Sequence, residues 1–311
     1  MLEIIYAGTP EFAVPALQAL LQGEHRVVAV YTQPDRPAGR GRKLQASPVK
    51  RCALAHGLEV RQPQNFKSEQ DVAALRELRA DLMIVAAYGL LLPQGVLSAP
   101  RLGCINIHAS LLPRWRGASP IQQAILAGDT HSGVTLMKMD RGLDTGAMIA
   151  SRSLAIDPQW SAGDLHDRLA PLGADLLMDS LAEIESALAQ ARVQDDSLVT
   201  LAPRLTKQQA EIDWSKPQRR LLREIRAFNP WPVSYTFIEG DSLRLWRATA
   251  SDRASAGRPG EVLAHDVDGV YVACRDGVLQ VTELQFAGRN RCSAAQALNA
   301  RNLQGTLLGK R

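Results

Sequence analysis

Cysteine is scarce in this 311-residue chain, and long apolar runs are missing. The four cysteines (Cys52, Cys104, Cys274 and Cys292) are scattered without CxxC spacing, which argues against a zinc site or a disulfide framework. No stretch approaches the roughly 18 consecutive apolar residues that a membrane helix needs. The N-terminus has neither the basic region nor the apolar run of a signal peptide. We therefore expect a cytoplasmic protein with no bound metal and no membrane partner.

Common nucleotide-binding and nucleophile motifs are also missing. The first predicted strand runs into AGTPEF, which has one glycine where a dinucleotide fingerprint needs three. The chain contains neither GxxxxGK(S/T) nor GxSxG. A dehydrogenase is therefore the poorest fit, and an ATP-binding enzyme is disfavoured.

Strands and helices alternate along the first half of the chain. The patterns predict strands at 2–8, 26–32, 58–63, 81–89, 103–110 and 132–140, with helices at 10–23, 47–57 and 68–80. Ser47 is a good helix cap, followed by Pro48 at the first helical position. We expect residues 144–156 to form an extended segment or a hairpin, and 161–190 to form a long helix broken near Pro171. Such alternation predicts an α/β domain over residues 1–190, with a mostly parallel, Rossmann-like sheet that binds ligands at the carboxyl ends of its strands.

The last third of the chain has a different pattern. Periodicity is lost over residues 191–208, which we interpret as a linker, and a basic helix follows and ends at Pro230. Short runs separated by Gly and Asp then predict a small antiparallel barrel or sandwich within a second domain, 209–311. The net charge of +4 arises entirely after residue 208, a weak indication of a polyanionic partner.

The candidate chemistry lies in CINIHASLLPRWRGASPIQ, residues 104–122. Alternation places Ile105 and Ile107 on one face of a strand, and Asn106 and His108 on the other. Asp144 follows a later strand and precedes TG, where it can occupy a tight turn at the same edge. An amide, an imidazole and a carboxylate can together stabilise an oxyanion and move a proton, which suits acyl transfer to an amine. All three residue types also occur in loops for structural reasons, and spacing alone leaves that alternative open.

INIHASLLPRWRGASPIQ and the later LDTG resemble the folate-dependent formyltransferases. The resemblance extends from residue 1 to about residue 300. It includes the stretches YAGTPEFAVPAL, TQPDRPAGRGRKLQASPVK, VAAYGLLLP, RAFNPWPVS and IDWSKP. They are most similar to the members that act on methionyl initiator tRNA. The resemblance implies a Rossmann-like catalytic domain followed by an OB-like barrel that binds tRNA.

The activity implied by the resemblance is transfer of the formyl group of 10-formyltetrahydrofolate to the α-amino group of methionyl initiator tRNA. Asn106, His108 and Asp144 would then be catalytic. The folate-binding residues would be Ser110, Leu111, Leu112 and Pro113, with Tyr88, Gly89 and Leu90 lining the same slot by their backbone groups. The donor is a co-substrate, and no metal is implied.

The tRNA contacts are expected in an exposed basic loop, residues 34–47, and in the linker. The composition of the loop alone suggests solvated surface, whereas the resemblance implies that the loop contacts tRNA through Arg36, Arg42 and Lys43. Lys207 would lie near the acceptor stem. Arg219, Arg220, Arg223 and Arg226 on the basic helix either bind tRNA or form a solvated face. We expect a monomer.

Two other functions fit parts of the sequence. A formyltransferase or formyl-folate hydrolase with a small acceptor, or water, would share the three catalytic residues, but needs neither the basic loop nor the basic tail. A non-catalytic tRNA-binding protein would need no intact Asn106, His108 and Asp144.

Overall fold

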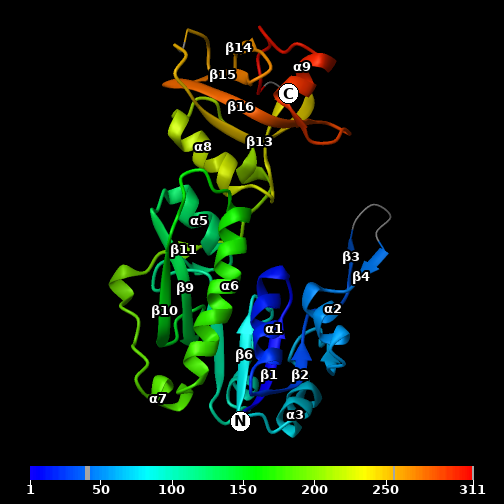
Figure 1. Cartoon of the computed structure of the whole chain (residues 1–311), viewed down its shortest axis with the longest axis vertical. Coiled ribbons are helices and arrows are strands. Elements are labelled where there is room, and N and C mark those ends of the chain that lie inside the picture. Colours follow the sequence, from blue (N-terminus) through cyan, green and yellow to red (C-terminus); the bar gives the residue numbers. More distant parts are fainter. Residues whose placement is uncertain (39–42, 255, 310–311) are drawn as a thin grey trace. The chain divides into compact units, whose positions relative to one another are not determined.

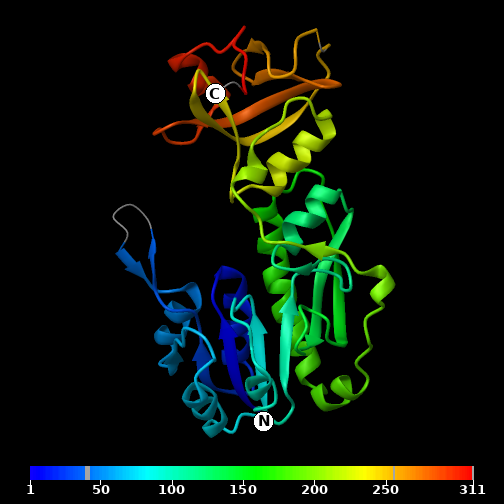
Figure 2. The ribbon, with the colours of Figure 1, turned by 180° about the vertical axis from the view of Figure 1, so that it is seen from behind.

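The computed structural model describes residues 1–38, 43–254 and 256–309. Its residues cluster into two compact units (Figures 1 and 2). The first unit comprises 1–120, 131–155 and 166–202, and the second comprises 121–130, 156–165 and the chain from 203 onward.

The first unit is built on a seven-stranded sheet with strand order β10-β9-β7-β6-β1-β2-β5. The strands are β1 (Glu3–Gly8), β2 (Arg26–Tyr31), β5 (Val60–Arg61), β6 (Leu82–Ala86), β7 (Cys104–His108), β9 (His131–Lys138) and β10 (Met148–Ala155). The pairs from β5 to β7 are parallel, whereas β9 runs antiparallel to both β7 and β10. The predicted, mostly parallel α/β sheet is thus confirmed. Its order reverses beside β1, the kind of position where such sheets bind ligands.

Helices cover both faces of this sheet. They are α1 (Val14–Gln22), α2 (Pro48–Ala55), α3 (Glu69–Glu77), α4 (Gln94–Leu97), α6 (Ala162–Leu181) and α7 (Ile184–Ala189). Ile5 and Met83 pack with Leu75 of α3 and Val96 of α4 on one face. On the other face, α6 lies so close that a Cβ on Gly173 would sit 2.9 Å from the Ile107 Cγ2.

One of the two predicted local helix signals is confirmed and the other is wrong. The Ser47 side chain accepts a hydrogen bond from the Lys50 amide at 3.0 Å, with Pro48 in the first turn of α2, as predicted. The predicted break near Pro171 is wrong, because α6 continues unbroken to Leu181. Burial of Leu169 and Leu177 on either side holds the helix together, and outweighs the hydrogen bond that proline cannot donate.

Two short strand pairs lie outside the main sheet of the first unit. β3 (Arg36–Ala38) and β4 (Lys43–Gln45) form an antiparallel ribbon from the basic stretch near the N-terminus. β8 (Arg116–Gly117) pairs in parallel with β11 (Leu201–Ala202). The predicted linker therefore contributes a strand, β11, and this strand pairs with the residues that follow the His108 segment.

The second unit contains an antiparallel sheet, as predicted, in the order β12-β13-β16-β15-β14, with β17 paired to β16. The strands are β12 (Ser234–Ile238), β13 (Asp241–Ser251), β14 (Val262–His265), β15 (Val270–Cys274), β16 (Gly277–Phe286) and β17 (Cys292–Ser293). Its helices are α5 (Pro120–Ala127), α8 (Gln218–Ala227) and α9 (Ala294–Ala300).

The C-terminal segment joins the two ends of this sheet. The Leu308 amide donates to the Gly260 carbonyl beside β14 at 2.8 Å, and the Gly309 amide donates to the Phe237 carbonyl of β12 at 2.9 Å. The segment thereby satisfies backbone groups at both edges, as closure into a barrel requires.

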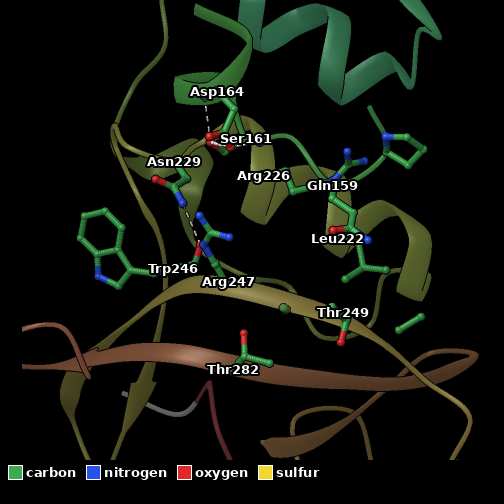
Figure 3. A pocket seen from close by; sticks show the side chains of 13 residues that line it. Gln159, Ser161, Asp164, Leu222, Arg226, Asn229, Trp246, Arg247, Thr249 and Thr282 are labelled. Atoms are coloured by element: carbon green, nitrogen blue, oxygen red, sulfur yellow. Dashed lines mark hydrogen bonds between the residues drawn. The ribbon is translucent and has the colours of Figure 1, made fainter. Parts of the chain in front are cut away.

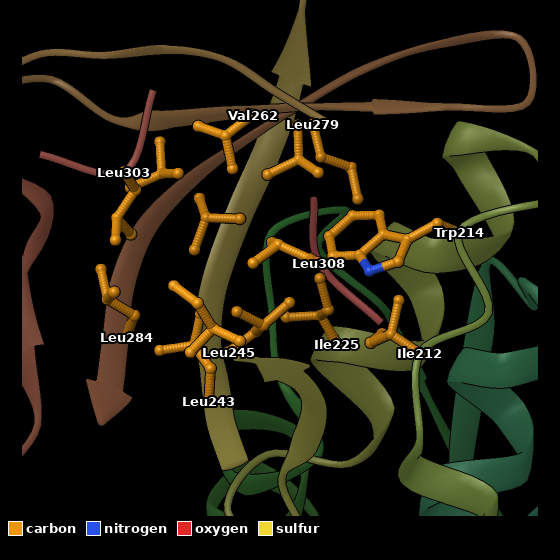
Figure 4. Packing of buried hydrophobic residues seen from close by; sticks show 14 of the residues in the cluster. Ile212, Trp214, Ile225, Leu243, Leu245, Val262, Leu279, Leu284, Leu303 and Leu308 are labelled. Atoms are coloured by element: carbon orange, nitrogen blue, oxygen red, sulfur yellow. The ribbon is translucent and has the colours of Figure 1, made fainter. Parts of the chain in front are cut away.

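The core of the second unit fills the space between α8 and this sheet (Figure 4). Leu221 and Ile225 of α8 pack against Leu245 and Leu279. Trp214 is 5% exposed, and its indole nitrogen donates to the Thr236 hydroxyl at 3.1 Å. The spacing of Leu221 and Ile225 gives α8 one apolar face and leaves its arginines on the other.

Candidate active site

Strand β7 places an amide and an imidazole at the carboxyl edge of the first unit's sheet. Ile105 and Ile107 are buried on the opposite face, which fixes the direction of Asn106 and His108. β7 pairs in parallel with β6, so both strands end at the same edge. The His108 side chain is only 6% exposed.

The Asp144 carboxylate meets both side chains from a turn 38 positions away from Asn106. Its Oδ1 accepts from the Asn106 Nδ2 at 3.4 Å, and its Oδ2 lies 3.6 Å from the His108 Nδ1. Oδ2 also accepts from the Gly117 amide at 2.9 Å. Asp144 has a φ of +53°, a left-handed conformation that aspartate tolerates better than most residues. The three predicted catalytic side chains therefore converge.

The imidazole of His108 has a hydrogen bond at one nitrogen and a carboxylate facing the other. Nε2 lies 2.9 Å from the Trp115 carbonyl oxygen, and Nδ1 faces Asp144. Because a carbonyl oxygen can only accept, this contact requires a hydrogen on Nε2. The ring is thus oriented by a carbonyl on one side and a carboxylate on the other, as a proton-handling histidine needs.

Thr135 anchors the loop that follows β7. This residue is fully buried on β9, where its hydroxyl donates to the Ser110 carbonyl at 2.7 Å and accepts from the Leu112 amide at 3.1 Å. The Ser110 hydroxyl in turn donates to the Arg114 carbonyl at 2.6 Å. Leu112 is buried, whereas Leu111 and Pro113 remain partly exposed. The loop therefore presents a fixed apolar surface beside His108.

The segment after β6 exposes backbone rather than its aromatic side chain. Tyr88 is buried against Phe66, and this burial raises the pKa of the Tyr88 phenol. The Gln33 side-chain amide donates to the carbonyls of Tyr88 and Gly89 at 3.0 and 2.9 Å. Gly89 has a φ of +79°, and a Cβ there would lie 2.5 Å from the Gln33 Nε2. Leu90 is partly exposed.

Gln194 and Arg116 support this site, and reasoning from sequence missed both. The Gln194 amide donates to the carbonyls of Asp144 and Gly146, and its oxygen accepts from Arg116. A polar residue in an aperiodic stretch carries no local signal of such contacts. The one local feature that could have drawn attention to Arg116 is its position directly after Trp115, in the loop that follows the His108 strand.

The predicted tRNA contacts are distributed as follows. Arg36 is exposed on β3, Lys43 occupies β4, and Arg42 lies outside the described residues. Lys207 is exposed in the second unit, at the start of a short 3-10 helix, Gln208–Ala210.

Three of the four α8 arginines bind carbonyl groups within the second unit. Arg220 and Arg223 donate to the Leu126 and Ala127 carbonyls at the end of α5, at 3.0 and 3.1 Å. Arg226 reaches the Trp160 carbonyl at 3.5 Å, and burial lowers the pKa of its guanidinium. Arg219 is exposed. Arg220, Arg223 and Arg226 therefore hold the α5 end and the 156–165 segment.

The second unit also contains a cavity of about 360 Å³ between α8, β13 and the 156–165 segment (Figure 3). Some of its polar groups bind one another. The Asp164 carboxylate accepts from the Ser161 hydroxyl at 2.7 Å, and the Asn229 amide donates to the Trp246 carbonyl at 2.9 Å.

The described residues contain neither a cluster of metal-ligating side chains nor a helix suited to a membrane. Across residues 1–38, 43–254 and 256–309, no three His, Cys, Asp or Glu side chains group as metal ligands would. Within the same ranges, no helix is both long and apolar enough to cross a bilayer.

Comparisons with known proteins cover nearly the whole chain. A formyl transferase family model matches residues 2–181, and a formyl transferase C-terminal domain model matches residues 204–302. Methionyl-tRNA formyltransferase of Hahella chejuensis is 51% identical over 96% of this chain and 94% of its own length. The protein of the same name from Methylococcus capsulatus is 50% identical over 99% of this chain and all of its own.

Solved structures share the fold at low sequence identity. An N-formyltransferase from Helicobacter canadensis superposes with a TM-score of 0.66 at 18% identity, over 90% of this chain and 98% of its own. HypX of Aquifex aeolicus gives a TM-score of 0.66 at 18% identity, over 96% of this chain and 48% of its own. The predicted family is confirmed: the chain belongs to the formyl transferase family.

Proposed function

We propose that this enzyme transfers the formyl group of 10-formyltetrahydrofolate to the α-amino group of methionyl initiator tRNA. The observation that carries the proposal is the convergence of Asn106, His108 and Asp144 at the sheet edge. About 50% identity over both units to relatives named methionyl-tRNA formyltransferase supports the choice of acceptor.

The chemistry is a direct acyl transfer. A free α-amino group has a pKa near ~8, so a substantial neutral fraction is available to attack the formyl carbon. The carbonyl oxygen then gains negative charge. Asn106 would stabilise it with the Nδ2 hydrogen that does not bind Asp144, and His108 with its Nε2 hydrogen, which would exchange the Trp115 carbonyl for this oxygen. Removing one such donor typically lowers kcat by ~10²–10³-fold. Asp144 orients His108 and helps to pass the amine proton, through water, to the departing folate N10.

The folate donor would lie along the loop 110–113. Thr135 fixes the backbone of this loop, so Leu111 and Pro113 can form a rigid apolar wall for a flat pterin ring. The backbone at Tyr88, Gly89 and Leu90, restrained by Gln33, would form the opposite side of the slot. The Ser110 hydroxyl is used within the loop and shapes it.

The tRNA would contact the β3–β4 ribbon and the region around Lys207. Arg36 is exposed, and Lys43 lies on the same ribbon, with Arg42 as a third cation of this stretch. We further propose that the enzyme is a cytoplasmic monomer. In this proposal, its catalytic domain spans 1–190, a linker spans 191–208, and a tRNA-binding domain spans 209–311.

Acceptor choice tests the proposal. Purified enzyme is incubated with 10-formyltetrahydrofolate and methionyl initiator tRNA, uncharged tRNA, free methionine or an amino-sugar nucleotide. Formylation confined to the charged tRNA is expected. Equal formylation of a small amine would replace the proposal with a small-acceptor enzyme, and folate turnover without any acceptor would make the protein a hydrolase.

Charge reversal tests the tRNA surface. Lys207→Glu should raise the KM for charged tRNA several-fold and leave the KM for the folate donor unchanged, because only the acceptor is polyanionic. Arg36→Glu should raise the KM for charged tRNA as well, but it also removes the Arg36 bond to the Gln33 oxygen, so only its KM for tRNA is compared. Arg79→Glu is the matched control, since Arg79 is exposed before β6, at the amino ends of the strands. An equal effect from the control would mean that net charge alone matters.

A further inference from the structure

We propose that Gln194 is a positioning residue for the transfer: it holds the Asp144 turn against the loop that orients His108. The inference rests on the proposed function and concerns a residue outside the three side chains assigned to the chemistry. The contacts that support it all lie within the first unit.

Gln194 donates both of its amide hydrogens to the backbone around Asp144. Its Nε2 lies 2.8 Å from the carbonyl oxygens of Asp144 and of Gly146. The side chain is buried, with the residue only 5% exposed, so water competes little for these bonds. Two bonds to carbonyls on either side of Thr145 restrict rotation of the turn that carries the carboxylate.

The turn needs such a restraint. Asp144 has a positive φ of +53°, which costs free energy that surrounding contacts must offset. Asp140 restrains the other end of the turn, where its Oδ1 accepts from the Gly142 amide at 2.9 Å and from the Thr145 hydroxyl at 2.6 Å. The Asp144 carboxylate thus lies between two independent sets of hydrogen bonds.

The oxygen of the same amide connects this turn to the His108 loop. The Gln194 Oε1 accepts from the Arg116 Nε at 2.9 Å, and the Arg116 guanidinium also reaches Asp196 at 3.0 Å. Arg116 follows Trp115, whose carbonyl binds the His108 Nε2. Through one buried amide, the carboxylate and the carbonyl that fix His108 are therefore held together.

The consequence for catalysis is geometric. Loss of Gln194 lets the Asp144 carboxylate shift relative to His108, without removing any group that contacts substrate. A displacement of about 1 Å at a reacting centre can cost ~10²-fold in rate. We therefore expect a loss in kcat with little change in KM for either substrate.

The test uses Gln194→Glu in the full-length enzyme. Glutamate keeps the shape and can still accept from Arg116, but it cannot donate to the Asp144 and Gly146 carbonyls. We expect kcat with methionyl initiator tRNA to fall about 10- to 100-fold, because a displacement of up to about 1 Å at the reacting centre costs a rate factor of this order. The KM values should stay within about twofold. Gln190→Glu is the control, because the Gln190 amide is exposed and binds Ser186 in the same stretch, away from Asp144.

A double-mutant cycle separates positioning from general damage. In an Asp144→Asn background, measured with enzyme in excess, Gln194→Glu should cost less than about threefold, because the group it positions is already lost. Retention of wild-type kcat by Gln194→Glu would overturn the proposal, and so would the same fold loss in both backgrounds.

A second variant covers the case in which Gln194→Glu does not fold. Arg116→Lys keeps a cation near Asp196 but has no donor at the Nε position, so Gln194 loses its oxygen contact. We expect a kcat loss of about 3- to 10-fold, again reduced in the Asp144→Asn background. An unchanged kcat would contradict the proposal. A wild-type enzyme that does not formylate methionyl initiator tRNA would instead refute the proposed function, so the two failures are distinguishable.

Discussion

Replacing Thr135 by valine should loosen the loop that follows His108. The Thr135 hydroxyl makes two hydrogen bonds to the backbone of this loop, to the Ser110 carbonyl and from the Leu112 amide. Thr135 is fully buried and lies opposite His108 across the β7–β9 pair. Valine has the same shape but neither donates nor accepts, so Thr135→Val removes the two bonds without creating a large cavity.

The size of the effect follows from burial. An unpaired buried N–H costs roughly 1–3 kcal/mol, and an ordinary hydrogen bond contributes about 1 kcal/mol. The Leu112 amide and the Ser110 carbonyl together then predict a loss of about 2–4 kcal/mol in the free energy of unfolding. Thr135→Ser keeps the hydroxyl and removes one methyl group, which should cost about 1 kcal/mol.

Chemical denaturation of the wild type, Thr135→Val and Thr135→Ser measures the difference directly. The KM for the folate donor, measured in parallel, should rise in Thr135→Val and stay near the wild-type value in Thr135→Ser. A valine variant as stable as the wild type would refute the reasoning. So would a serine variant that loses as much stability as the valine variant, because the methyl group rather than the hydroxyl would then be responsible.

Three further predictions concern other parts of the chain. Gly117→Ala should lower the free energy of unfolding by about 1–3 kcal/mol, because the backbone φ of +123° at this position is strained for alanine. It should also lower kcat, because the Gly117 amide binds Asp144. Unchanged unfolding and turnover would contradict this prediction. Leu308→Ala should lower the free energy of unfolding of the second unit by about 2–5 kcal/mol, since Leu308 packs in its core. Thermal unfolding measures this, and a smaller decrease in Tm than that of an exposed Leu→Ala control would refute the prediction. Hydrogen bonds from Lys50 lower the pKa of the Asp35 carboxyl from its usual 3.8. The loss of stability caused by Asp35→Asn should therefore be full above pH 3.8 and disappear as the pH falls below it. A difference in unfolding midpoint between variant and wild type that stays constant across this pH range would argue against the ion pair.

The sequence predicted those parts of the site that depend on local pattern. Alternation along one strand placed Asn106 and His108 on the same face, and the end of a later strand placed Asp144 nearby. The supporting residues were not predictable in this way. Gln194 lies 50 positions from Asp144, and Thr135 lies 25 from Ser110, so only tertiary folding brings them together.

The fold shows the same division. The order of the main strands in both units, and of α1, α2, α3, α6 and α8, followed from apolar periodicity and from signals such as the Ser47 cap, whereas α4, α5 and α9 were not predicted. The predicted break near Pro171 failed because burial of the surrounding helix outweighs a local proline signal. The role of the C-terminal segment was also unpredicted, since its contacts with Gly260 and Phe237 are backbone hydrogen bonds that any residue type can make.

We propose that Asn106, His108 and Asp144 together perform formyl transfer to methionyl initiator tRNA. The decisive experiment is single-turnover transfer from 10-formyltetrahydrofolate, compared between the wild type and Asn106→Ala, His108→Ala and Asp144→Asn. We expect each variant to bind both substrates and to lose about 10²-fold or more in rate. Variants that transfer the formyl group within a few-fold of the wild-type rate would contradict it.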